Sequence, residues 1–255
     1  MNTNPDLVLV TGGASGIGAA AVAALAALRM RPIVADIAPS TKAVDGALAW
    51  ERPFDVSDEE SVSRGVSEIE ERYGPLYGLV NAAGILGRMH PPERIKLANW
   101  DREMNVDLRG VFLVCREAGT LMAKRGRGSI VNVASIAGMS SGPIHAYSAA
   151  KAGVIRLTST LAGEWGRRGV RVNAVSPGFT RTPGLEVGLA AGALDSDALT
   201  RPSAMGRFVE AAEVGQAIAW LIGPLSSGVT GVNLPVDAGF LAGVTWEAYG
   251  GFRDG

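Results

Sequence analysis

The chain has few of the residue types on which several classes of protein depend. Its 255 residues include one cysteine and two histidines, and aromatic residues make up only 6%. The single cysteine, Cys115, excludes an internal disulfide framework, and its apolar neighbours predict a buried helical residue. Cys115, His90 and His145 lie far apart in the sequence and do not form a zinc-ligand pattern. We therefore expect no metal site and a protein of a reducing compartment, the cytoplasm.

The chain also lacks an excess of charge of one sign and a long hydrophobic run. Lys and Arg number 24 and Asp and Glu number 25, which gives a formal net charge of −1. This balance argues against a nucleic-acid-binding protein. The longest apolar run, residues 19–28, is shorter than the roughly 20 residues of a membrane helix. The first residues lack the basic and apolar regions of a secretory signal. We expect neither a nucleic-acid nor a membrane partner.

Short apolar runs alternate along the chain with longer helical segments. Strands are predicted at 7–10, 33–35, 79–80, 129–134, 170–175 and 231–236. Helices are predicted at 16–29, 100–124, 146–165 and 211–222, and after Ser57, which would form a capping box with Glu60. Such alternation predicts βαβ units, and hence an α/β fold with a parallel sheet and helices on both faces. No linker divides the chain, so residues 1–255 are interpreted as one domain.

Residues 178–209 form the exception to this alternation. They are rich in Gly, Ala, Pro and Thr, with weak helical periodicity between Leu185 and Leu199. A segment of this length between a strand and a helix is more often a lid over a substrate than an idle connection. A disordered surface insertion is the alternative.

A glycine-rich turn follows the first predicted strand and leads directly into an Ala-rich helix. Gly12 permits a tight turn, Gly16 allows the backbone to approach a pyrophosphate, and Gly18 allows the helix to pack closely on the strand. The spacing G-x-x-x-G-x-G differs from the more familiar G-x-G-x-x-G, and the Lys of a P-loop is missing. The order strand, turn and helix favours a dinucleotide-binding site over a simple turn.

Asp36 follows the second predicted strand. A carboxylate at this point accepts hydrogen bonds from the ribose hydroxyls of NAD and repels the 2′-phosphate of NADP. The neighbouring residues Ser15 and Ile37 supply no basic group for that phosphate. The pattern predicts NAD, with a turn-capping aspartate as the alternative.

Ser135, Tyr147 and Lys151 form a candidate catalytic group. Tyr147 and Lys151 are four residues apart on a predicted helix and therefore share one face. A tyrosine that acts as a base near neutral pH needs its pKa lowered by roughly 3 units, and a nearby ammonium has the required sign. Ser135 can then hold the substrate oxygen while Tyr147 removes its proton. Taken alone, the Tyr–Lys pair is also common on solvated helix faces.

In combination these motifs resemble the short-chain dehydrogenase/reductase family over nearly the whole chain. The matching segments are TGGASGIG at 11–18, Asp36, Asp55-Val56, NAAG at 81–84, Ser135, YSAAK at 147–151 and PGFTRT at 177–182. The resemblance implies a Rossmann-like doubly wound fold with seven parallel strands. It also implies a small-molecule substrate and a homo-oligomer, a dimer or a homotetramer.

The resemblance further implies a set of cofactor-binding residues. They are Gly12, Ser15, Gly16, Ile17, Gly18, Asp36, Asp55, Val56, Asn81, Ala82, Gly84, Tyr147, Lys151, Pro177, Gly178, Phe179 and Thr182. Asp55 and Val56 would contact the adenine, residues 81–84 would line the cofactor, and residues 177–182 would hold the carboxamide. Lys151 would also donate a hydrogen bond to the nicotinamide ribose.

One position departs from the family pattern. The family usually has an asparagine, a member of a proton relay, where this chain has Asp107 in the segment DLRG. Asn105 lies two residues earlier and would point to a different helix face. Asp107 is therefore a candidate catalytic residue, and its charge could raise the pKa of Lys151. A purely structural role is the alternative.

The substrate pocket is expected at residues 85–90, residues 139–145 and the lid. These stretches are mostly apolar, which favours a cyclic or aromatic secondary alcohol, or its ketone. His145, Ser135 and Tyr147 are candidate substrate contacts, although His145 could equally be a structural or exposed histidine. The aromatic tail with Trp246, Tyr249 and Phe252 could pack across a subunit interface or on its own subunit.

The leading interpretation is an NAD-dependent oxidoreductase that interconverts a secondary alcohol and its ketone. A 3-oxoacyl-thioester reductase of fatty-acid type is one alternative, which Asp36 and the lack of a basic docking patch disfavour. A non-catalytic NAD-binding scaffold is another. The complete group of Ser135, Tyr147 and Lys151 argues against it, because a binding module has no need for all three.

Overall fold

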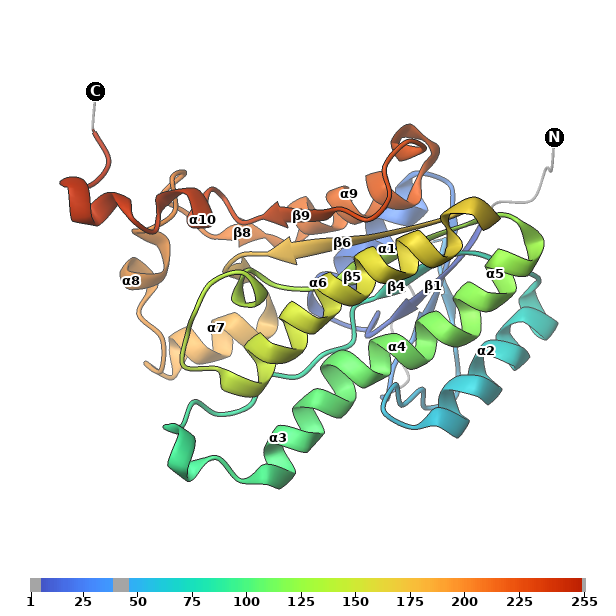
Figure 1. The fold of residues 1–255 in the computed structure, drawn as a ribbon, viewed down its shortest axis with the longest axis horizontal. Helices are drawn as coiled ribbons and strands as arrows, with labels where there is room; N and C mark the ends of the chain where they lie inside the picture. The colour runs from blue at the N-terminus through green and yellow to red at the C-terminus, as the bar shows by residue number, and fades with distance from the viewer. Residues whose placement is uncertain (1–5, 39–45, 254–255) are drawn as a thin grey trace.

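A seven-stranded parallel sheet forms the centre of the molecule. The fold is that of a computed structural model, which describes residues 6–38 and 46–253. The strand order is β3-β2-β1-β4-β5-β6-β9, with every neighbouring pair parallel (Figure 1). The strands are β1 (Leu7–Thr11), β2 (Arg31–Ala35), β3 (Leu48–Ala49), β4 (Leu76–Asn81), β5 (Gly128–Val133), β6 (Val170–Pro177) and β9 (Asn233–Val236). The doubly wound α/β fold predicted from the sequence is confirmed; the short strand β3 was not anticipated.

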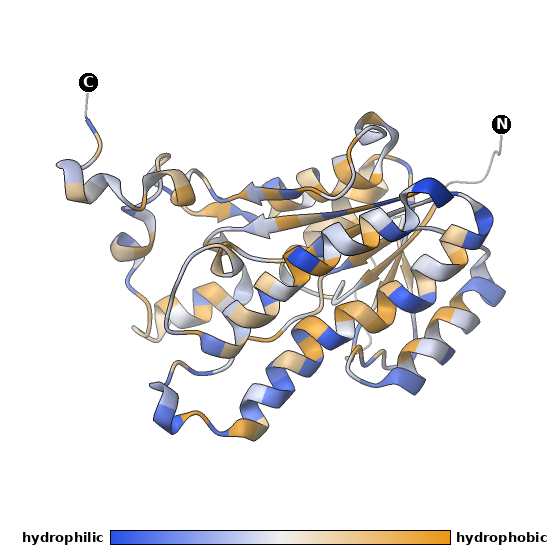
Figure 2. Ribbon diagram, in the orientation of Figure 1, coloured by the Kyte–Doolittle hydropathy of each residue, from blue (hydrophilic) through white to orange (hydrophobic). Residues whose placement is uncertain are grey.

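Helices cover both faces of this sheet. On one face lie α1 (Gly16–Ala27) and α9 (Ala211–Ile222), which pack on alternate strand residues such as Val8 and Val10. On the other face lie α2 (Glu59–Tyr73), the helix from residue 97 to 125 and α6 (His145–Trp165), which pack on residues such as Leu9. The side chains of a strand alternate between faces, so each buried strand contributes to both cores. Figure 2 shows the resulting hydrophobic strands between amphipathic helices.

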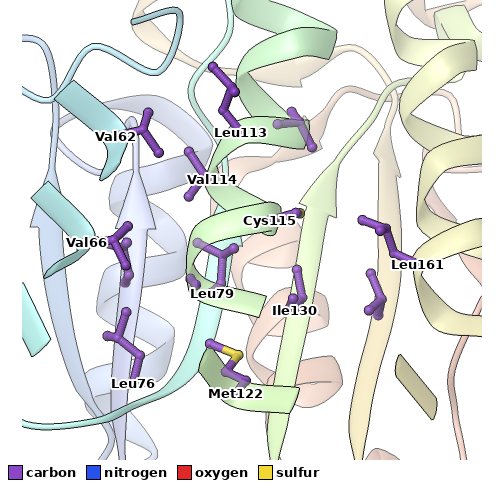
Figure 3. Close-up of a cluster of buried hydrophobic side chains, with 14 of the residues drawn as sticks. Val62, Val66, Leu76, Leu79, Leu113, Val114, Cys115, Met122, Ile130 and Leu161 are labelled. Carbon is purple, nitrogen blue, oxygen red and sulfur yellow. The ribbon is translucent and has the colours of Figure 1, made fainter. Parts of the chain in front are cut away.

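The core on this side brings together side chains from α2, β4, β5, α6 and the helix from residue 97 to 125 (Figure 3). Val62 and Val66 of α2 face Leu76 and Leu79 of β4, and Leu161 of α6 belongs to the same cluster. Cys115 lies fully buried in this cluster, as its apolar neighbours predict.

The predicted helix at 100–124 is longer than expected and is not uniformly α-helical. It consists of α3 (Leu97–Met104), α4 (Val111–Val114) and α5 (Thr120–Arg125), joined by π-helical turns at Asn105–Gly110 and Cys115–Gly119. Each π turn carries more residues than an α turn and so re-aims the side chains that follow it. Asp107 lies within the first of these turns.

The predicted capping box of Ser57 and Glu60 is wrong. The helix begins one residue later, and Asp58 is its N-cap: the carboxylate accepts from the backbone N–H groups of Glu60 and Ser61. Ser57 instead donates its hydroxyl to Asp55 at 2.7 Å. A carboxylate is a stronger acceptor than a hydroxyl and also favours the positive end of the helix dipole.

Residues 178–209 contain helices α7 (Pro183–Ala190) and α8 (Ser196–Thr200). They are bounded by two short paired strands, β7 (Thr180–Arg181) and β8 (Val209–Glu210). The segment ends against the C-terminal part of the chain, where Ser203 donates to the carbonyl of Ala238 at 2.6 Å. Within the described part of the chain, no helix is long and apolar enough to cross a membrane.

Beyond β9 the chain forms α10 (Phe240–Gly243) and a 3₁₀ turn at Trp246–Tyr249. Trp246 stacks on Phe252 with ring centroids 5.3 Å apart, whereas the Tyr249 side chain is exposed. The three tail aromatics therefore do not form one cluster.

Candidate active site

A cavity of about 760 Å³ opens at the carboxyl ends of β1, β2 and β4. In its wall lie many of the residues predicted to bind a cofactor: Gly12, Ser15, Gly16, Ile17, Gly18, Asp36, Asp55, Val56, Ala82, Gly84 and Thr182. This cavity is called the cleft below. Ligands in doubly wound folds bind at this edge of the sheet, where the strand order reverses.

The glycine-rich turn shapes the floor of the cleft. Gly12 and Gly16 have φ angles of +65° and +52°, which side chains with a Cβ rarely adopt. A Cβ on Gly12 would lie 2.6 Å from the backbone of Ala83, and one on Gly18 would collide with the Gly12 carbonyl oxygen. The turn thus leaves open space above the N-terminus of α1, where backbone N–H groups attract anions.

Asp36 lies in the cleft wall directly after β2. Its carboxylate accepts from the backbone N–H groups of Ala14 at 3.2 Å and Ala38 at 3.3 Å. The first bond ties the end of β2 to the glycine-rich turn and fixes where the carboxylate stands.

Asn81 lies below the cleft rather than in its wall. Its amide donates to Asn132 at 2.9 Å and to the sulfur of Cys115 at 3.2 Å, and Asn132 donates in turn to Thr158 at 2.9 Å. These buried bonds fasten the ends of β4 and β5 to the helices behind them. Burial raises the pKa of the Cys115 thiol to about 12, so this cysteine is not a nucleophile.

Lys151 is almost fully buried on α6 and is held by polar groups from other elements. Its ammonium donates to the carbonyl of Val133 at 3.1 Å and lies 3.6 Å from a carboxylate oxygen of Asp107. The same nitrogen is 5.4 Å from the ring centroid of Tyr147. The predicted shared helix face of Tyr147 and Lys151 is therefore present, and it is turned into the protein.

Asp107 is fully buried beside this lysine. One carboxylate oxygen accepts from the backbone N–H of Ile85 at 3.0 Å, while the other has no hydrogen-bond partner among the residues described. Burial raises the pKa of Asp107 to about 6, although the Lys151 charge acts in the opposite direction. Asn105 lines the cleft instead, on a different face of the helix.

Gly84 connects this buried pair to the cleft. A Cβ on Gly84 would lie 2.7 Å from an Asp107 carboxylate oxygen and 3.4 Å from the Lys151 nitrogen. Since Gly84 is itself part of the cleft wall, Lys151 and Asp107 stand directly behind that wall.

The other predicted site residues lie around the same end of the sheet. Ser135 follows β5 and accepts from the N–H of Ala137 at 3.1 Å; within the described residues it has no hydrogen bond to Tyr147. Phe179 meets Phe240 edge to face at 5.3 Å, and Thr182 caps α7. Neither Pro177, at the end of β6, nor Gly178 after it belongs to the cleft wall.

A second cavity, of about 460 Å³, adjoins the cleft and shares Ile85 and Arg102 with it. We call it the side cavity. Two of the stretches expected to form the substrate pocket contribute to it, with residues from 85–90 and 143–145, including His145. The sequence did not indicate the contribution of α3, which adds Asn99, Arg102 and Glu103. In the described regions, no group of three or more His, Cys, Asp or Glu side chains could hold a metal ion.

Comparison with known proteins places this architecture in a family. Residues 12–241 match a family model described as enoyl-(acyl carrier protein) reductase. The chain is 39% identical to cis-4-hydroxycyclohexanecarboxylate dehydrogenase of Sinomonas cyclohexanicum over 244 residues, 92% of this chain and 96% of that protein. It is 37% identical to 2,5-dichloro-2,5-cyclohexadiene-1,4-diol dehydrogenase of Sphingobium indicum, over 92% of this chain and 96% of that protein.

A solved structure of similar shape comes from Brucella melitensis and is described as ribose-5-phosphate isomerase. It has 46% sequence identity and a TM-score of 0.90, with 98% of each chain covered. More distant solved relatives contain NADP in one case and NAD⁺ in another. The chain belongs to the short-chain dehydrogenase/reductase family of oxidoreductases, and membership alone does not select between the two dinucleotides.

Proposed function

We propose that this protein is an NAD-dependent oxidoreductase that interconverts a cyclic secondary alcohol and its ketone. The observation that carries the proposal is the placement of Lys151. Its ammonium is held between the Val133 carbonyl and Asp107, faces the ring of Tyr147, and lies behind the cleft wall at Gly84.

The cleft fits a dinucleotide cofactor. The glycine-rich turn leaves backbone N–H groups facing the cleft where a pyrophosphate would lie, and a Cβ at Gly12 or Gly18 would collide with neighbouring backbone and distort the turn. Asp36, Asp55 and Val56 would hold the adenosine half, and Thr182 lies in the wall on the side of the 178–209 segment. When bound, the nicotinamide supplies the hydride acceptor or donor for the reaction.

Two side chains of the protein, Tyr147 and Ser135, would handle the proton and the oxygen of the substrate. Tyr147 takes the proton of the alcohol during oxidation and returns it during ketone reduction, while Ser135 holds the substrate oxygen. The Lys151 ammonium lies 5.4 Å from the centroid of the Tyr147 ring, where it would attract the negative charge that develops on the Tyr147 oxygen as the proton moves. Asp107 and the Val133 carbonyl keep that ammonium in place.

NAD is favoured over NADP by the charges in the cleft. Asp36 stands at the end of β2 with its carboxylate tied to the glycine-rich turn, and Asp55 adds a second negative charge. Arg102 is the one basic residue among the described cleft-lining residues, and it lies on α3 rather than after β2. A 2′-phosphate near Asp36 would meet repulsion without a compensating cation.

A cyclic substrate is supported by two relatives whose names specify ring alcohols. The acyl-carrier-protein activity in the family description and the isomerase activity ascribed to the Brucella protein are alternatives. An aldose–ketose isomerase has no use for a dinucleotide cleft, and the glycine-rich turn and Asp36 therefore favour the dehydrogenase.

Tyr147→Phe tests the proposed reaction. The variant keeps the ring but loses the hydroxyl, so we expect turnover to fall by at least about a hundredfold while NADH binding changes little. Substrate turnover is followed by NADH absorbance with cyclic, aromatic and linear alcohols, their ketones and an acetoacetyl thioester. Tyr73→Phe, on α2 and outside the cleft, is the matched control. Unchanged turnover in Tyr147→Phe would refute the assignment.

A further inference from the structure

The side cavity carries more positive than negative charge. Arg88 and Arg102 line it together with His90 and His145, and Glu103 is the one acidic residue in its described lining. Neither Arg88 nor Arg102 forms an ion pair or a side-chain hydrogen bond with any residue in 6–38 or 46–253. With both histidines neutral, the ionised side chains leave one net positive charge.

The side cavity lies next to the proposed reaction centre. Ile85, which separates it from the cleft, donates its backbone N–H to Asp107 at 3.0 Å. Ala146, another lining residue, directly precedes Tyr147 in α6. A substrate whose reacting carbon lies at Tyr147 can therefore extend into this cavity.

The lining of the side cavity combines apolar and cationic side chains. Leu86, Ile95, Pro143 and Ile144 provide apolar surface for a small ring. Glu103 packs against Gly87, where a Cβ would collide with its carboxylate, and this places its negative charge against the backbone of the loop. The two guanidinium groups remain available to an anion from outside.

We infer that the side cavity binds a carboxylate substituent of the substrate, through Arg88 and Arg102. The inference rests on the proposed oxidoreductase function and adds the substrate class: a ring ketone or alcohol that carries one carboxylate. A guanidinium matches the two oxygens of a carboxylate with parallel hydrogen bonds. One net positive charge suits a single negative charge better than the double charge of a phosphate ester.

A pair of ketones of equal shape tests this inference. The holoenzyme with NADH is given 4-oxocyclohexanecarboxylate and the neutral 4-oxocyclohexanecarboxamide. Charge-assisted hydrogen bonds are stronger than neutral ones, and a difference of about 1.4 kcal/mol corresponds to a factor of ten. We therefore expect kcat/KM for the carboxylate to exceed that for the amide by about tenfold or more. Raised ionic strength should narrow the ratio, because both arginines are exposed.

Substitutions of the arginines test whether the preference for the carboxylate arises in the side cavity. Arg88→Met keeps much of the length of the side chain and should remove most of the preference for the carboxylate, with little change for the amide. Arg94→Met is the matched control, because Arg94 is exposed on the neighbouring turn but does not line the cavity. Arg102 also lines the cleft proposed for the cofactor. For Arg102→Met the dissociation constant of NADH is therefore measured as well, so that weaker cofactor binding is not mistaken for a lost carboxylate contact.

Equal kcat/KM for the two ketones, or equal losses for both in Arg88→Met, would overturn the inference while leaving the oxidoreductase proposal intact. If neither ketone is reduced, calorimetry on the NADH-loaded protein compares cyclohexanecarboxylate with cyclohexanecarboxamide. A carboxylate preference that Arg88→Met abolishes supports the binding site even when the proposed reaction fails. Equal affinities for cyclohexanecarboxylate and cyclohexanecarboxamide would reject the proposed carboxylate site.

Discussion

At the scale of single residues, the most unusual feature is a carboxylate buried beside the candidate catalytic lysine. Asp107 stands where the family usually has a neutral asparagine, and its pKa is raised to about 6 mainly by burial. The charged form of Asp107 is therefore disfavoured in the folded protein relative to the unfolded chain. The folded state binds more protons than the unfolded state between the ordinary carboxyl pKa and this raised value.

The free energy of unfolding should consequently fall as pH rises through this interval, by up to about 3 kcal/mol from Asp107. Asp107→Asn removes the titration but keeps an oxygen that can accept from Ile85. We expect the unfolding free energy of the variant minus that of the wild type to be more positive above pH 6 than below pH 4, because only the wild type loses stability over this interval. Urea unfolding of both proteins across this range measures the difference, and a difference independent of pH would contradict the prediction.

Asp36 provides a second prediction at this scale. Asp36→Asn removes the negative charge and retains an oxygen that can accept from the N–H of Ala14. The ratio of kcat/KM for NADP to that for NAD should rise by about tenfold or more, equivalent to at least about 1.4 kcal/mol. Steady-state rates with each cofactor measure the ratio. Glu51→Gln, an exposed carboxylate outside the cleft, is the control; equal ratios in the two variants would remove the argument for NAD.

The relative positions of residues within local motifs could be predicted from the sequence, because the geometry of each motif is set within a few residues. The glycine-rich turn and Asp36 follow their strands directly, and the i, i+4 pair of Tyr147 and Lys151 needs only a helix. The partners of Lys151 could not be predicted in the same way. The Val133 carbonyl belongs to a distant strand, and Asp107 reaches the lysine from a helix whose path depends on packing.

At the scale of elements, the helix from residue 97 to 125 determines where Asp107 stands. Hydrophobic periodicity predicts this helix but not its two π turns, because the shift in hydrogen bonding depends on what the helix packs against. The second π turn ends at Gly119, which lies against α6. A Cβ on Gly119 would overlap the ring of Trp165, which is buried at the end of α6.

Gly119→Ala should therefore destabilise the protein by about 1–3 kcal/mol through overpacking. Gly163→Ala is the matched control, because Gly163 is exposed on α6 and an added methyl group would have no neighbour within 4 Å. That substitution should stabilise by about 0.5–1 kcal/mol, since it restricts the unfolded chain. Urea unfolding measures both variants. A neutral or stabilising effect of Gly119→Ala would contradict the prediction, because the added methyl group would then fit beside Trp165.

At the scale of the whole molecule, the C-terminal part of the chain holds the end of the 178–209 segment. The backbone N–H of Met205 donates to Ala238 at 3.0 Å, next to the bond from the Ser203 hydroxyl. Gly243 lies between the Pro202 carbonyl and the Phe252 ring, with no room for a Cβ. The sequence indicated the segment and the aromatic tail separately, but not this contact, which joins residues distant along the chain.

Removal of residues 246–255 takes the Phe252 ring away from Gly243, which packs on Pro202, and should thereby loosen the end of the segment proposed as a lid. We expect KM for the substrate to rise several-fold, with faster proteolysis between residues 183 and 207 and little change in NADH affinity, because the cleft touches the segment only at residues 182–184.

Light scattering on the same variant tests the alternative role of the tail in a subunit interface. Tyr249→Ser separates the two roles, since this exposed side chain makes no aromatic stack with Trp246 or Phe252. A lower mass in Tyr249→Ser would place the tail in an interface, whereas unchanged KM and proteolysis in the truncated chain would contradict its role in holding the lid.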